Sequence, residues 1–142
     1  TEAEWEKASR GTDGRKYPWG NTPEVSCDYA VMDTGGLDIG GCGEARTWEV
    51  GSKPLGMSPY GVHDMIGNVY EWTADWYADD YYLQTPAGGW VNPVGPESGS
   101  SRVLRGGSWF ADLSGYFRAS YRLSDTPSGR ESHFGFRCLE SL

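Results

Sequence analysis

The chain has 142 residues and a formal net charge of −8, with 21 Gly and 14% aromatic residues. This length is typical of one domain with a buried core, and the acidic charge argues against binding to the phosphate backbone of nucleic acids. The Gly-rich, aromatic-rich composition disfavours a helical bundle, no apolar run approaches the roughly 20 residues of a membrane span, and no signal peptide is recognisable.

The first eleven residues, TEAEWEKASRG, predict the only well-formed helix of the chain. Thr1 can cap this helix, and Glu4 three residues later completes a capping-box pattern. Gly11 is placed to end the helix. The apolar side is expected to consist of Ala3, Trp5 and Ala8.

Two stretches after this helix, residues 12–24 and 33–43, are predicted to be irregular. Turn-forming pairs fill TDGRKYPWGNTPE, and residues 33–43 contain five Gly. The cysteines Cys27 and Cys42 can form a disulfide or remain buried thiols, and both alternatives stay open. Cys138 makes the count odd, so the cysteines do not assign a redox compartment. No CxxC pair is present, which argues against a zinc site.

The stretch SPYGVHDMIGNVYEWTADWY predicts a helical turn followed by a strand. A helical spacing of apolar residues over 62–66 ends at Gly67-Asn68, so only one short turn is expected there. From Val69 to Trp76 the residues alternate between two faces, as in a strand.

Three further segments complete the chain. Residues 77–100 predict a long loop rich in Tyr, Pro, Gly and Ser, and such loops are usually functional or disordered. Residues 101–109, SRVLRGGSW, predict a strand that ends at a Gly pair. Residues 133–139, HFGFRCL, predict a strand with one face formed by Phe134, Phe136 and Cys138.

Catalytic groups are sparse in this sequence. The only histidines are His63 and His133, and Ser108 in GGSW does not stand in a G-x-S-x-G elbow, so a Ser–His–Asp site is not expected. Carboxylates are abundant, but in an acidic chain they are better explained as solvated surface.

Residues 64–71, DMIGNVYE, form a candidate calcium site. Ca²⁺ prefers carboxylate and carbonyl oxygens, and Asp64 and Glu71 flank a flexible turn whose Gly67 and Val69 carbonyls could complete the ligand set. In the alternative interpretation, Asp64 caps a turn and Glu71 is buried against an arginine.

Four stretches in this order resemble the formylglycine-generating enzyme, or sulfatase-modifying factor, family: TEAEWEKASRGTDGRKYPWGN, SPYGVHDMIGNVYEWTADWY, RVLRGGSW and GFRC. The resemblance implies an α+β, C-type-lectin-like fold, rich in loops, with a small twisted antiparallel sheet and few helices. Family members usually carry a further N-terminal half, so residues 1–142 resemble the C-terminal portion of one such domain.

The resemblance has two implications for metals. The family binds structural calcium through N-x-x-G-x-A-x-E, and the matching positions are Asp64, Gly67, Val69 and Glu71. The enzymes also carry two cysteines after GGS, which would fall at Ala111 and at Gly115 or Tyr116. No Cys stands between Cys42 and Cys138, so no copper is expected and the chain is interpreted as a non-catalytic member.

Variable proteins of bacterial diversity-generating retroelements share this fold and carry variable residues between GGSW-like and GFR-like motifs, here residues 102–138. Rewriting the two adenines of an Asn codon can produce the residues at 110–116, 123–125 and 132–133. The expected ligand face therefore comprises Phe110, Ala111, Asp112, Ser114, Gly115, Tyr116, Leu123, Ser124, Asp125, Ser132 and His133.

This interpretation implies a protein or cell-surface ligand and display on the cell surface or outside the cell. Tyr and Phe supply rigid contact area, and Ser, Gly and Asp adapt to a partner. Trp109, Arg118, Arg122 and Arg137 would be scaffold, with Glu71 and Asp75 as candidate partners of buried arginines. The alternatives are an ordinary surface loop, a divergent oxidase that modifies sulfatases, or a sensor domain of a larger kinase or protease.

Overall fold

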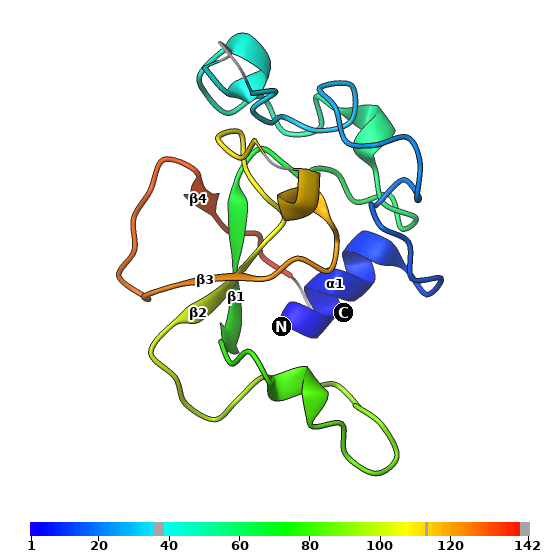
Figure 1. Cartoon of the computed structure of the whole chain (residues 1–142), viewed down its shortest axis with the longest axis vertical. Helices are drawn as coiled ribbons and strands as arrows, with labels where there is room; N and C mark the ends of the chain where they lie inside the picture. The colour runs from blue at the N-terminus through cyan, green and yellow to red at the C-terminus, as the bar shows by residue number, and fades with distance from the viewer. Residues whose placement is uncertain (36–38, 113, 140–142) are drawn as a thin grey trace.

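The structure is a computed structural model that describes residues 1–35, 39–112 and 114–139 (Figure 1). Regular elements are few, and loops make up most of the described chain. The regular elements of the described residues are one helix, four strands and four 3₁₀ turns. They are α1 (Glu2–Arg10), the strands β1 (Tyr70–Trp76), β2 (Arg102–Arg105), β3 (Leu123–Asp125) and β4 (Phe134–Gly135), and the 3₁₀ turns η1 (Gly41–Gly43), η2 (Pro54–Gly56), η3 (Tyr81–Leu83) and η4 (Ser114–Phe117). The expected loop-rich α+β architecture is confirmed.

Helix α1 begins and ends where the sequence predicts. The Oγ1 atom of Thr1 accepts a hydrogen bond from the Glu4 N–H at 3.3 Å, and the Glu4 carboxylate accepts one from the Thr1 amino group at 2.7 Å. Gly11 follows the last turn at φ 68°, where its N–H donates to the Lys7 carbonyl. The capping box and the glycine stop therefore define α1 locally.

The sheet has the strand order β3-β2-β1-β4. The pairs β1–β2 and β2–β3 are antiparallel, whereas β1–β4 is parallel. The expectation of a purely antiparallel sheet is therefore wrong for one pair. Because β3 and β4 run in the same direction at opposite edges, residues 126–133 form a crossover connection instead of a hairpin.

Two predicted elements differ from the structure. The helical turn over 62–66 is absent, because Asp64 has φ 53° and is followed by Gly67 and Asn68 at φ 80° and 64°, all in the left-handed region. Strand β4 covers only two residues of the predicted 133–139 strand. Beyond them no sheet partner is present among the described residues, and Phe136 is 74% exposed.

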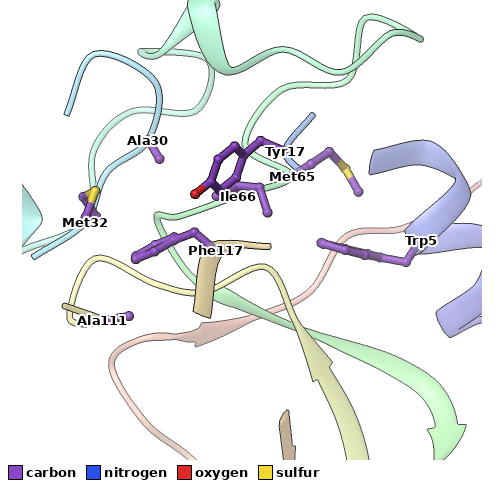
Figure 2. Close-up of a cluster of buried hydrophobic side chains, with 8 residues drawn as sticks. All are labelled: Trp5, Tyr17, Ala30, Met32, Met65, Ile66, Ala111 and Phe117. Carbon is purple, nitrogen blue, oxygen red and sulfur yellow. The ribbon is translucent and has the colours of Figure 1, made fainter. Parts of the chain in front are cut away.

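The core lies between α1, the loops of the first half of the chain, and the segment that follows β2 (Figure 1). Figure 2 shows its buried side chains, which are Trp5, Tyr17, Ala30, Met32, Met65, Ile66, Ala111 and Phe117. Cys27 and Cys42 form a disulfide that packs against this cluster, which decides the alternative left open by the sequence, while Cys138 is free and exposed.

A buried arginine network connects α1 to the sheet. Arg105 is fully buried, forms an ion pair with Glu6 at 2.6 Å, and donates to the carbonyls of Ala119 and Tyr121. Burial lowers the pKa of Arg105, and the nearby carboxylates oppose this shift. Such a cation is tolerated in the interior because it is paired and hydrogen-bonded.

Candidate ligand-binding site

A pocket of about 250 Å³ opens where the chain leaves β2 and where it enters β4. Six of its lining residues belong to the predicted ligand face, namely Phe110, Ala111, Asp112, Tyr116, Leu123 and His133. The other three are Tyr70, Ser108 and Tyr121. The structure therefore brings together residues from the two ends of the predicted segment.

Backbone hydrogen bonds hold the segment after the Gly pair in place. The Trp109 N–H donates to the Asn68 carbonyl at 2.9 Å, the Trp109 carbonyl accepts from the Gly41 N–H at 2.7 Å, and the Ala111 carbonyl accepts from the Asp33 N–H at 2.9 Å. These bonds do not depend on side chains, so substitutions at exposed positions of this segment leave its support intact.

A close packing contact explains the glycine at the start of this segment. Gly107 has φ 75°, and a Cβ atom at this position would lie 2.8 Å from the ring of Phe117. The turn therefore requires glycine both for its conformation and for space. It directs the chain away from β2 and into the pocket wall.

His133 reaches the pocket from the other end of the segment. Its carbonyl accepts a hydrogen bond from the Tyr70 N–H at 2.8 Å, which anchors the crossover beside β1. Its ring stacks on Phe110 with centroids 5.9 Å apart, and Phe110 meets Trp109 edge-on at 5.5 Å. Phe110 nonetheless remains 60% exposed, so this aromatic wall faces solvent.

The floor of the pocket contains residues that sequence reasoning missed. Tyr70 of β1 is only 7% exposed, and Tyr121 lies 5.1 Å from Tyr116 between ring centroids. Burial raises the pKa of Tyr70, with smaller contributions from the phenols of Tyr121 and Tyr116. Strand alternation over 69–76 did place Tyr70 on the opposite face from Glu71, but only the fold shows which face borders the pocket.

The remaining predicted residues do not line the pocket. Ser124 and Asp125 lie in β3, and Asp125 accepts hydrogen bonds from Thr126, while Ser114, Gly115 and Ser132 lie outside the pocket walls. The predicted variable range 110–116 also includes Leu113, which lies outside the described residues.

The scaffold predictions are partly confirmed. Arg137 pairs with Glu71 at 2.5 Å as expected, but Arg122 pairs with Glu2 of α1. Asp75 accepts a hydrogen bond from the Glu2 N–H, and among the described residues it forms no ion pair with an arginine. The exposed Arg118 forms no ion pair within the described ranges, although its charge helps to lower the pKa of Glu24.

Two of the three positions expected for the enzymes' cysteines, Ala111 and Tyr116, line this pocket. Ala111 is 7% exposed in the pocket wall, and Gly115 and Tyr116 belong to η4. None of them carries sulfur, so the side chains at these positions cannot form a thiolate pair.

The expected calcium ligands provide both free and occupied oxygens. One oxygen of Asp64 accepts from the Gly51 N–H at 2.7 Å, whereas the Gly67 and Val69 carbonyls accept no hydrogen bond from the described residues. Both oxygens of Glu71 are engaged, by Arg137 and by the Trp5 Nε1–H at 2.6 Å. Glu71 could bind an ion only if Arg137 releases it, and within the described residues no group of three or more His, Cys, Asp or Glu side chains is arranged to hold a metal ion.

A larger pocket of about 620 Å³ lies between α1 and the 81–93 segment, and it contains none of the predicted site residues. Several of its charged side chains already form internal ion pairs, since Glu6 pairs with Arg10 and Arg105, and Arg122 pairs with Glu2. Its size alone therefore does not make it the better candidate site.

A family model described as the sulfatase-modifying factor enzyme 1-like domain matches residues 1–142. The chain belongs to this family. It is 37% identical to the formylglycine-generating enzyme of Thermomonospora curvata over 150 residues, which cover 97% of this chain and 47% of the enzyme. It is also 40% identical to the serine/threonine-protein kinase pkn1 of Chlamydia pneumoniae, over all of this chain and 20% of the kinase.

Among solved structures, Treponema denticola variable protein 1 matches this sulfatase-modifying factor domain with a TM-score of 0.73 and 38% identity. The match covers 96% of this chain and 44% of the variable protein. The domain thus has the C-type-lectin-like fold of this family, and it spans about half the length, or less, of these relatives. Within residues 1–35, 39–112 and 114–139, no helix is long and apolar enough to cross a membrane.

Proposed function

We propose that this domain is a non-catalytic binding module that recognises a protein or cell-surface ligand through the pocket beside β1. The observation that carries the proposal is the clustering of six predicted ligand residues around one open pocket. Large rings and a carboxylate there surround Ala111, the position at which the family resemblance implies an enzyme cysteine. A rigid aromatic surface with polar neighbours is a common design for recognition.

Residues 102–138 are proposed to be a genetically diversified segment. Support comes from the match to Treponema denticola variable protein 1 and from the backbone bonds that hold residues 109–111 regardless of side chain. Sequencing the adjacent DNA tests the proposal. We expect a near-copy of the segment that differs at adenines, next to a reverse transcriptase gene. If the flanking DNA lacks such a copy, the segment is an ordinary surface loop.

An enzymatic function is the principal alternative, because the family includes formylglycine-generating enzymes. The direct assay incubates the protein and Cu⁺ with a sulfatase peptide and detects cysteine conversion by mass spectrometry. We expect no conversion, since no thiol lies between Cys42 and Cys138. Turnover that survives replacement of Cys138 by Ala would overturn the non-catalytic proposal.

A sensor domain of a larger protein is a third candidate, supported by the match to the kinase pkn1. The full reading frame tests this candidate directly, because a kinase or protease segment in the same frame would support it. The binding pocket would then serve as the input site of that larger protein.

Calcium is proposed as a structural ion held by Asp64 and by the Gly67 and Val69 carbonyls, with Glu71 joining if it leaves Arg137. Ligand binding only to the native state must raise the unfolding temperature. We therefore expect a chelator to lower the melting midpoint and added Ca²⁺ to restore it. An unchanged midpoint would instead mean that Arg137 alone neutralises Glu71, without an ion.

A further inference from the structure

The pocket beside β1 is built mainly from aromatic rings. Tyr70, Tyr116 and Tyr121 contribute three phenols, while Phe110 and His133 form a stacked wall. None of the three phenol oxygens makes a hydrogen bond to another described residue, and the Tyr70 oxygen is not among the buried polar atoms that lack a partner, so it is open to a ligand even though the residue as a whole is only 7% exposed. Phenol oxygens without a partner on an aromatic surface indicate a ligand group that packs on the rings and forms hydrogen bonds with the hydroxyls.

The charges around the pocket indicate that the bound group should be positively charged. Asp112 is its one carboxylate, is exposed, and forms no ion pair with a described residue. None of the nine lining residues is Lys or Arg, and the chain carries a net charge of −8. An anionic guest would therefore be repelled, whereas a cation is attracted both by Asp112 and by the ring faces.

The size of the pocket limits the guest to one group. A volume of about 250 Å³ lies just below the range of roughly 300–1,000 Å³ typical of small-molecule sites. A folded segment cannot enter it, but a single long side chain can. A protein ligand would then contact the surrounding exposed residues while one side chain fills the pocket.

From these observations we infer that the pocket accepts the ammonium or guanidinium group of a Lys or Arg side chain on a protein ligand. The inference rests on the proposed binding function of this same site. Asp112 neutralises the cation at the rim, and the rings of Tyr121, Tyr116 and Phe110 surround its aliphatic stem and charged head. Tyr70 forms the floor and offers its phenol oxygen as an acceptor.

Histidine NMR can test this inference, because the chain has only two histidines and just one of them lines the pocket. The probes are N-acetyl-lysine methylamide and N-acetyl-arginine methylamide, with the neutral N-acetyl-norleucine methylamide and methyl mannoside as comparisons. Each is titrated against ¹⁵N-labelled protein. We expect saturable shifts of the His133 ring signals with the cationic probes, no shift of His63, and about fivefold weaker binding of the norleucine probe.

A charge-matched pair of variants locates the attraction. Asp112→Asn is expected to weaken binding of the lysine probe about two- to fivefold. The control Glu97→Gln removes the same charge from an exposed residue that does not line the pocket, and it should leave binding unchanged. Equal weakening by both variants would mean that only the net charge of the chain matters, which overturns the inference.

The other outcomes separate this inference from the proposed function. Equal binding of the norleucine probe, or shifts with methyl mannoside alone, would overturn the cation specificity and leave a binding pocket in place. If His133 responds to none of the four probes, the inference fails. Failure of the non-catalytic proposal is detected separately, by cysteine conversion in the sulfatase-peptide assay.

Discussion

Replacing two phenylalanines of the same segment by Ala should separate core from ligand surface. Phe117 is 0% exposed and packs in the central hydrophobic cluster, whereas Phe110 is 60% exposed at the pocket rim. Truncation of a fully buried Phe costs about 3–5 kcal/mol, since a cavity adds to the lost transfer free energy. For Phe110, with less than half of its surface buried, the free energy of unfolding should fall by only about 1 kcal/mol.

Thermal and urea unfolding followed by circular dichroism measure this difference. At about 3–4 °C per kcal/mol for a chain of this size, Phe117→Ala should lower the melting midpoint by about 9–20 °C and Phe110→Ala by about 3–4 °C. If Phe117→Ala does not fold, the milder Phe117→Leu provides the comparison. Equal destabilisation by the two Ala variants would refute the reasoning, because Phe110 would then be a core residue.

Three other predictions concern stability. Glu71→Gln removes the charge partner of Arg137, which is 30% exposed, and should cost about 1–3 kcal/mol in urea unfolding, while a change below about 0.5 would mean that solvent screens the pair. Cys27→Ala opens a disulfide spanning 15 residues and should cost about 2–3 kcal/mol, whereas unchanged stability would show that the bond does not constrain the unfolded chain. The Arg15 guanidinium lowers the pKa of Asp13 from 3.8 to about 2, so the stability contributed by this carboxylate is present above about pH 3.8 and is lost as the pH falls through about 2. An NMR titration should show this midpoint and its return toward 3.8 in Arg15→Gln, and an unshifted midpoint in the native chain would contradict the pairing.

Much of the site region was predictable because its signals are local. The Gly pair after β2 predicts a turn whose positive φ angles residues with a side chain rarely adopt. The absence of Cys between Cys42 and Cys138 can be read directly from the sequence. The missing cysteines indicated that Ala111 and Gly115 or Tyr116 form no thiol pair, and the Asn-codon pattern placed residues 110–116 and His133 on the expected ligand face. The structure then placed six of the predicted residues around one pocket.

Other parts of the site could not be predicted, because they depend on contacts between distant segments. Tyr70 and Tyr121 resemble ordinary strand and loop aromatics until the sheet brings them beside the pocket. The partner of Arg122 was expected near β1, yet it is Glu2, which is 120 residues away in the chain. Opposite charges are numerous in this sequence, so pattern alone cannot choose between them.

The sequence by itself determined the helix with its capping box, the glycine turns and the two main strands, since each depends on residues within a few positions of one another. It also indicated the family, through four motifs that follow one another in the same order along the chain. Only the tertiary structure decided the direction of β4, the pairing of Cys27 with Cys42, and the aromatic floor of the pocket. These features depend on how a chain with little regular structure crosses over itself, and that path is set by the sum of many weak contacts between remote residues.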